Sequence, residues 1–116
     1  LPILDARAEE LGVELSLAQS NSESEIIELI HGHADWDGLI INAGGYTHTS
    51  VAIADAIAAT QLLTVEVHLS NIYKREAFRH HSYISPVAWG CIVGFGWRGY
   101  LAAIDLLHGR LTEGNA

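Results

Sequence analysis

Apolar residues recur along the chain with two different periods, and the period changes from one segment to the next. A spacing of three or four predicts a helix over residues 1–11. Gly12, which follows it, is the residue type that commonly ends such a helix. Residues 13–18 alternate apolar and polar side chains, and this pattern predicts a short strand.

A second helix and a second strand follow. Asn21 or Ser22 is the predicted N-cap, and Glu25 lies three residues after Ser22, as in a capping box. The apolar stripe of this helix continues to about His33. Residues 39–41 are then an unbroken apolar run, which is expected of a strand buried on both faces.

The remaining segments continue the alternation. The pattern predicts a helix that begins at Thr49 or Ser50, strands over 63–69 and 91–93, and a closing helix over 99–108. Alternating helices and strands imply a parallel sheet with helices on both faces. The predicted fold class is therefore α/β, a doubly wound parallel sheet in three α/β/α layers, within one domain over residues 1–116.

This order has no strand before the first helix. A doubly wound domain normally begins with a strand, and that strand lies near the middle of the sheet. Without it, two parts of the sheet would have unpaired edges. The sequence also starts at Leu1 and contains no Met. We therefore expect an N-terminal strand and its following loop to belong to the native protein, outside this sequence.

Composition narrows the class of partner. Apolar residues make up 49% of the 116 residues and charged ones 17%, which excludes a disordered chain. A net charge of −8 argues against nucleic acid or an anionic membrane as partner, but not against an anionic small molecule. No apolar run is long enough to span a membrane. Cys91 is the single cysteine, so no internal disulfide is possible and a cytoplasmic location is expected.

Acidic, basic and imidazole side chains are concentrated in residues 65–82, and three of the six Lys and Arg residues lie within 74–79. His68 comes two residues after Glu66 near the end of a predicted strand, so the two side chains share a face. A carboxylate orients a neighbouring imidazole and favours its protonated form, which suits a general acid. The alternative is a buried His68 whose ring is merely satisfied by Glu66.

Other candidates lie near strand ends, where ligands bind in such sheets. Asn42 either faces a substrate or caps the turn before two glycines, and His48 either donates to a ligand or lies on the surface. Asp55 is placed to face a partner subunit from an otherwise apolar helix. Arg79 would share one side with Arg75 if this segment is helical, and suits a carboxylate or polyol; a salt-bridged surface loop is the alternative.

No metal and no cofactor are expected. Zinc sites need three or four regularly spaced ligands, whereas the histidines here lie beside a group of cations that would repel a metal ion. Cys91 heads a predicted strand and is expected in the core. Residues 94–99 give a G-x-G-x-x-G pattern, but at the last strand and without a later acidic ribose partner, so a tight turn is predicted.

Taken together, the motifs resemble those of type II 3-dehydroquinate dehydratase. The matching segments are 19–23, 41–52, 66–71, 75–76, 78–82, 85–86, 90, 94–96 and 99–100. The resemblance implies a flavodoxin-like fold and a homo-oligomer, a dodecamer of four trimers. It also implies a hydro-lyase that removes water from 3-dehydroquinate by anti elimination through an enolate, giving 3-dehydroshikimate without metal or Schiff base. The reaction would serve aromatic amino acid biosynthesis by the shikimate pathway, or quinate breakdown.

The resemblance also implies residue roles. His68 would protonate the departing hydroxyl, with Glu66 orienting the ring. Asn42 and the backbone amides of Leu69 and Ser70 would hold the substrate carboxylate, and His48 and Arg79 would bind its ring hydroxyls. Asp55 would reach the site of a neighbouring subunit.

This sequence differs from the family pattern at its N-terminal end. The family's first strand carries a Gly-Pro-Asn-Leu type motif, and its mobile lid carries a Tyr base with an activating Arg; neither is in this sequence. If the sequence were complete, negligible dehydratase activity would be expected. One alternative is a binding module that keeps the anion pocket without turnover. Another, an unrelated flavodoxin-like domain for a phosphate-bearing cofactor, is disfavoured because no glycine-rich loop follows an early strand.

Overall fold

Three parallel strands form the middle layer of the protein, for which a computed structural model describes residues 2–113. The strands are β1 (Gly38–Ile41), β2 (Leu63–His68) and β3 (Gly90–Val93), in the order β1-β2-β3. In their register Glu66 stands between Ile41 on one side and Cys91 on the other. β2 is therefore the central strand of the described sheet.

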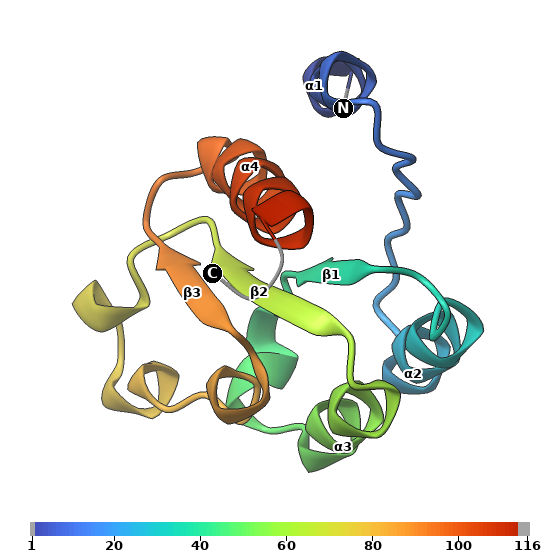
Figure 1. Ribbon diagram of the computed structural model, residues 1–116. Coiled ribbons are helices and arrows are strands. Elements are labelled where there is room, and N and C mark those ends of the chain that lie inside the picture. The colour runs from blue at the N-terminus through green and yellow to red at the C-terminus, as the bar shows by residue number, and fades with distance from the viewer. Residues whose placement is uncertain (1, 114–116) are drawn as a thin grey trace.

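Helices cover both faces of this sheet. α1 (Pro2–Leu11) and α4 (Arg98–Glu113) lie on one face, and α2 (Glu23–Gly32) and α3 (Val51–Thr60) on the other (Figure 1). This arrangement of layers confirms the predicted α/β class. None of the helices within residues 2–113 is long and apolar enough to cross a membrane.

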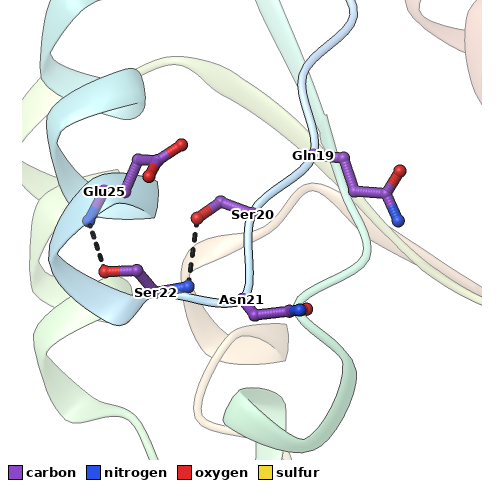
Figure 2. Close-up of a pocket in the computed structure, with 5 residues that line it drawn as sticks. All are labelled: Gln19, Ser20, Asn21, Ser22 and Glu25. Carbon is purple, nitrogen blue, oxygen red and sulfur yellow. Dashed lines mark hydrogen bonds between the residues drawn. The ribbon is translucent and has the colours of Figure 1, made fainter.

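The predicted helix ends are present. Ser22 Oγ accepts a hydrogen bond from Glu25 N at 3.3 Å and caps α2 (Figure 2), and Ser50 Oγ caps α3 by accepting from Ile53 N at 3.0 Å. Gly12 follows α1 with a φ of +71°, a value that favours glycine.

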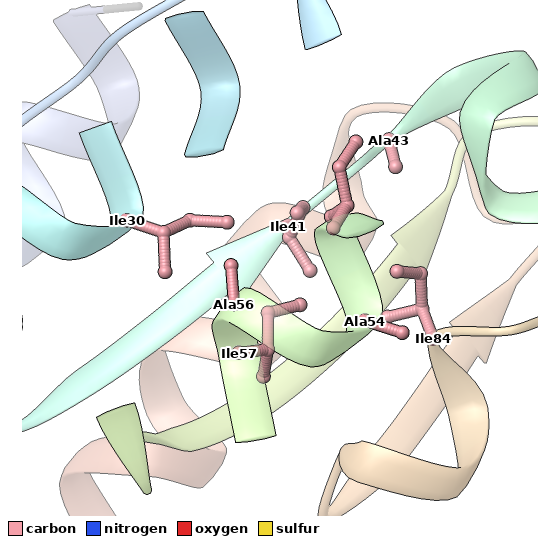
Figure 3. Close-up of a cluster of buried hydrophobic side chains, with 8 residues drawn as sticks. Ile30, Ile41, Ala43, Ala54, Ala56, Ile57 and Ile84 are labelled. Atoms are coloured by element: carbon pink, nitrogen blue, oxygen red, sulfur yellow. The ribbon is translucent and has the colours of Figure 1, made fainter. Parts of the chain in front are cut away.

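Within residues 2–113, two buried clusters hold the layers together. On one face Ile41 of β1 meets Ile30 of α2 and Ile57 of α3 (Figure 3). On the other, Val65 and Val67 of β2 pack against α4. Apolar side chains thus leave β2 on the α4 face, while Glu66 and His68 take the opposite face near its carboxyl end.

The predicted strand over residues 13–18 is wrong. This segment runs extended from α1 towards α2 (Figure 1) and pairs with no strand among the described residues. Alternation of side chains favours an extended backbone, but a strand also needs a neighbour for its N–H and C=O groups. A cleft of about 1720 Å³ lies between this segment, β1 and α4. The sequence-based expectation of one more central strand stays a prediction, and this cleft is where it would fit.

Burial at the sheet edges also differs from expectation. Residues 38–40 are half-buried and only Ile41 of β1 is buried, and Cys91 of β3 is exposed as a residue. The reason is shared: β1 and β3 are the two edge strands of the described sheet. The fully buried strand is β2, where residues 64–68 are all buried.

The links after β1 and β2 contain short 3-10 turns that the apolar pattern does not predict. η1 (Gly44–His48) follows β1, whereas η2 (Ile72–Lys74), η3 (Ala77–His80) and η4 (Ser85–Val87) lie between β2 and β3. η1 packs against η3, and Tyr83 N donates to Thr47 O at 2.9 Å. The two links therefore meet at the carboxyl end of β2.

Candidate active site

The carboxyl end of β2 presents a buried acid and imidazole. Glu66 is completely buried and His68 is 4% exposed, and Glu66 Oε2 lies 2.6 Å from His68 Nε2. An ionised carboxylate only accepts hydrogen bonds, so His68 donates from Nε2. Its Nδ1 is then the ring atom available to a ligand. The prediction that the two side chains share a face is confirmed.

Two serines complete the surroundings of the Glu66 carboxylate. Ser82 Oγ donates to Oε2 at 2.7 Å, and Ser85 Oγ donates to Oε1. Burial acts to raise the pKa of Glu66, but the hydrogen bonds from His68, Ser85 and Ser82 outweigh it, so the pKa of this carboxyl is lowered. Glu66 is therefore a buried anion whose charge is balanced by hydrogen-bond donors.

A second imidazole lies beside the first. The rings of His48 and His68 are nearly parallel, at 18°, with centroids 6.3 Å apart. His48 Nδ1 lies 2.8 Å from the His81 carbonyl oxygen and must donate to it, since a carbonyl only accepts. In the neutral ring this leaves Nε2 of His48 as an acceptor. His48 is half-buried beside His68, so the alternative of a free surface residue is wrong. The expected donation to a ligand is not available from Nε2 of the neutral ring, which can only accept.

Asn42 follows β1 and is held at both ends of its amide. Oδ1 accepts from Gly44 N at 3.1 Å, and Nδ2 donates to the Tyr100 hydroxyl at 3.0 Å. Gly44 has a φ of +57°, which the turn requires. Asn42 therefore does cap the turn, and one N–H of its Nδ2 group remains for a ligand.

Arg79 contacts Phe78, and Phe78 contacts the ring of His48. The Nε atom of Arg79 lies 2.6 Å from Glu76 Oε2, and its guanidinium lies 4.8 Å from the centroid of Phe78. Phe78 in turn meets the ring of His48 edge-on, at 6.2 Å between centroids. The salt bridge expected if this segment is only a surface loop is thus present. It uses Nε of Arg79, so both terminal nitrogens lie outside the pair with Glu76.

Arg75 does not share a helical face with Arg79, because the segment is not one helix. η2 ends before Arg75, whose backbone is extended at φ −109° and ψ −169°, and η3 begins only at Ala77. Arg75 and Arg79 therefore do not lie on one helix. The prediction that they share one side required a helix, and this requirement is not met.

Leu69 and Ser70 form an exposed bend directly after His68. The bend is tied to the tight turn over residues 94–97: Gly94 N donates to His68 O at 3.0 Å, and Gly96 N donates to Leu69 O at 2.9 Å. This turn, with positive φ at both glycines, agrees with the predicted turn at the G-x-G-x-x-G pattern. The bend therefore presents its backbone beside the imidazole of His68.

Asp55 lies apart from this group. It is exposed on α3, between the buried Ala54 and Ala56, and within residues 2–113 no hydrogen bond or ion pair joins it to the other candidate residues. The fold therefore does not bring Asp55 to the imidazoles of its own chain.

Glu66, His68 and Cys91 bring potential metal-ligand atoms within 4.8 Å of one another. The geometry fits a hydrogen-bonded acid better than a metal centre, because both carboxylate oxygens already accept from other groups. Desolvation of the thiol, followed by the negative charge of Glu66, raises the pKa of Cys91 to about 12. A thiol must lose its proton to bind a metal, so this environment works against metal binding.

A separate hollow of about 570 Å³ lies at the start of α2 (Figure 2). It is lined by Gln19, Ser20, Asn21, Ser22 and Glu25. Tyr46 of η1 donates from its hydroxyl to Asn21 O at 2.9 Å and so links this hollow to the turn that carries His48. The hollow contains none of the imidazoles, which gather at the end of β2.

Sequence reasoning did not assign a role to Ser82, Ser85 or Tyr100. The two serines are 16 and 19 residues beyond Glu66 in sequence, and only the fold of the η2–η4 segment brings them to it. The one local signal was the Ser-x-x-Ser spacing at the start of a turn, a spacing typical of hydroxyl capping. Tyr100 lies on α4, far from Asn42 in sequence, and no local sequence pattern predicts the hydrogen bond between them.

Comparison with known proteins places these features in a family. The sequence model described as Dehydroquinase class II matches residues 2–108. The chain is 54% identical to the 3-dehydroquinate dehydratase of Jannaschia sp. (strain CCS1), over 94% of this chain and 74% of that protein. It is 55% identical to the 3-dehydroquinate dehydratase of Trichodesmium erythraeum (strain IMS101), over 96% of this chain and 75% of that protein.

A solved structure agrees with the sequence comparison. The crystal structure of type II dehydroquinase from Butyrivibrio crossotus superposes with a TM-score of 0.88 and 42% identity, covering 91% of this chain and 75% of that one. Both the sequence and the fold of residues 2–108 therefore place this chain in the class II dehydroquinase family.

Proposed function

We propose that the protein is a 3-dehydroquinate dehydratase, a hydro-lyase that removes water from 3-dehydroquinate to give 3-dehydroshikimate. Membership of the class II dehydroquinase family supports this activity. The observation that carries it is the buried Glu66–His68 pair, whose 2.6 Å hydrogen bond fixes an imidazole at the end of the central strand.

His68 is the general acid of the proposed mechanism. Nε2 donates to Glu66, so the proton for the departing hydroxyl comes from Nδ1 of the protonated ring. A base first removes a proton from the substrate carbon next to the carbonyl, and the resulting enolate expels the hydroxyl as it takes the proton from His68. Water leaves, and the product is a conjugated enone. The ionised Glu66 stabilises the positive charge of the ring before transfer.

The substrate is held by groups on the surrounding turns. The remaining N–H of Asn42 and the backbone amides of Leu69 and Ser70 bind its carboxylate. The Nε2 atom of His48 accepts from a ring hydroxyl, and the terminal nitrogens of Arg79 bind another. These roles are supported by the stacking of His48 on His68 and by the contact of Arg79 with Phe78.

Further groups come from outside the described chain. We place the Tyr base and its Arg on a segment not included in this sequence, in keeping with the family resemblance. Asp55 is proposed to reach the site of a neighbouring copy in a dodecamer of four trimers, because it is exposed and apart from the imidazoles of its own chain. Light scattering of the purified protein tests this assembly. The single cysteine supports a cytoplasmic setting.

Enone absorbance with 3-dehydroquinate tests the activity, measured on a parent protein in which this sequence is joined to a family N-terminal strand and lid that supply the base. Product formation is expected, with a large fall in kcat for His68→Ala while circular dichroism and the melting temperature stay close to those of the parent. Unchanged turnover in that variant would remove His68 as the acid.

The same experiment separates the proposal from a non-catalytic binding module. A module that keeps only the anion pocket would be stabilised against heat by a quinate-like carboxylate. It would form no enone at any protein concentration, and that pair of results would contradict the dehydratase assignment.

A further inference from the structure

The turn over residues 82–85 folds back onto Glu66 through one hydroxyl. Ser82 Oγ accepts hydrogen bonds from Ile84 N and Ser85 N, both at 3.0 Å. A hydroxyl has one proton and two lone pairs. Because backbone N–H groups take up both lone pairs, the proton of Ser82 is directed to Glu66 Oε2, 2.7 Å away.

The oxygen that receives this proton is the one bound by the imidazole. Glu66 Oε2 accepts from Ser82 Oγ at 2.7 Å and from His68 Nε2 at 2.6 Å. Ser85 donates to the other oxygen. The backbone of the turn thus fixes Ser82, Ser82 fixes one carboxylate oxygen, and that oxygen fixes which nitrogen of His68 carries a proton.

We propose that Ser82 is a positioning residue for His68, acting through Glu66, with Ser85 as a secondary support. This inference rests on the proposed dehydratase function for its kinetic consequences. Ser82 is half-buried and its hydroxyl donates to Glu66, so it acts on His68 through that carboxylate. Together with Ser85 it keeps a fully buried carboxylate ionised, because a buried anion with fewer donors tends to take up a proton. Ser82 alone holds the oxygen that binds His68, and so fixes the carboxylate rotamer there.

Loss of this donor has a defined chemical consequence. With its carboxylate protonated or rotated away, Glu66 no longer requires a proton on Nε2 of His68. The proton of the neutral ring can then move to Nδ1, and the orientation of the acid is lost. The other titratable groups that face the pair within residues 2–113 are Cys91 from β3 and His48 from η1, and neither replaces the Ser82 donor.

The test compares Ser82→Ala with Ser82→Thr, which keeps the hydroxyl, and with Ser24→Ala, the same chemical change at an exposed serine of α2. Ser82→Ala is expected to lower kcat about tenfold, the effect of one lost hydrogen bond to a charged group. KM should stay nearly unchanged. The acid limb of the kcat profile should move to higher pH, because Glu66 takes up its proton earlier. Ser82→Thr should recover most of kcat, and Ser24→Ala should match the parent.

A second measurement does not depend on turnover. Nitrogen-15 NMR of the histidine rings reports which nitrogen of His68 is protonated, with His68→Ala identifying the signal. The parent should show Nε2–H, and Ser82→Ala should show a loss of this preference while the other histidine signals keep their positions. Ser85→Ala should change it less, because Oε1 does not bind the imidazole.

The outcomes are separable. If the parent forms no enone, the dehydratase proposal fails, and the NMR comparison still decides the role of Ser82. An unchanged His68 tautomer in a folded Ser82→Ala protein would overturn the positioning role. The same conclusion follows if kcat falls in Ser82→Ala without any shift of the pH profile, because a merely structural defect would do that.

Discussion

Glu66 illustrates how single residues here depend on their immediate partners. It is a fully buried carboxylate in a chain of net charge −8, and three donors within the same few ångströms make its ionised form the stable one. The same negative charge acts on its neighbour across the sheet, Cys91. Two predictions at the residue scale follow from this one charge.

The first concerns acid stability. The folded-state pKa of Glu66 lies below its ordinary value of 4.5, so the stabilisation from this group is complete above about that pH and is lost as pH falls through the lowered pKa. Urea midpoints measured from pH 7 downwards should therefore show a decline below about pH 4.5. The decline should be weaker in Glu66→Gln and nearly unchanged in Glu76→Gln, which alters an exposed salt bridge. Equal slopes in all three proteins would contradict this.

The second concerns thiol reactivity. A pKa of about 12 leaves almost no thiolate on Cys91 at neutral pH, although the residue is exposed at an edge strand. Alkylation by iodoacetamide at pH 8 should therefore be much slower in the native protein than in the same protein unfolded in urea. Glu66→Gln should speed the native reaction by removing the negative charge. A native rate equal to the unfolded one would show that Cys91 lacks this environment.

At the scale of elements, the packing of α4 on the sheet sets which positions tolerate a larger side chain. Gly99 lies buried where α4 begins, and a Cβ there would stand 3.1 Å from Val67 Cγ1 and 3.4 Å from Ile92 Cγ2. Gly109 lies on the same helix, and the nearest atom to a Cβ there is Glu113 Oε1 at 3.9 Å. The two glycines form a matched pair for one substitution.

Gly99→Ala is expected to lower the free energy of unfolding by about 1 kcal/mol, because overpacking against β2 and β3 outweighs the helical preference of Ala. Gly109→Ala should raise it by about 0.5–1 kcal/mol, since Ala loses less backbone entropy than Gly in a helix. Urea unfolding of both variants checks the pair. The packing argument would be wrong if the two substitutions changed stability in the same direction by similar amounts.

Elements also show where the pattern of side chains is sufficient and where it is not. α2 and α3 begin at the predicted caps because a hydroxyl and the N–H three residues later suffice to define the end. Residues 13–18 have the alternation of a strand but no paired neighbour, and so remain extended without becoming part of the sheet. Pairing is a property of two segments, and one segment's sequence does not contain it.

At the scale of the whole molecule, the distribution of charge matters more than its sum. The chain carries a net charge of −8, while three of its six Lys and Arg residues, Lys74, Arg75 and Arg79, lie on the η2–η3 segment. This segment packs against η1, which carries His48. A local positive field on an acidic protein attracts an anionic substrate at short range and is screened by salt over about 8 Å at physiological ionic strength.

The KM for 3-dehydroquinate, if the proposed function holds, should therefore rise with sodium chloride concentration. Lys74→Gln should raise KM at low salt and flatten this dependence. Arg110→Gln is the control, since Arg110 stacks on Trp89 just before the amino end of β3, away from the imidazoles. An uncharged osmolyte at equal osmolality should not reproduce the effect. A KM that is independent of salt would exclude electrostatic attraction by this cluster.

The sequence by itself determined the helices, three of the four predicted strands and the shared face of Glu66 and His68, because each depends on residues that are close together along the chain. It also indicated the family through contiguous motifs around Asn42 and His48. Only the tertiary structure decided which side chains contact each other across the sheet or from separate turns. The edge exposure of Cys91, the anchor of Asn42 on Tyr100, and the two serines on Glu66 are of this kind. Long-range contacts of this kind leave no period in the sequence, since the chain between them is free to differ in length and shape.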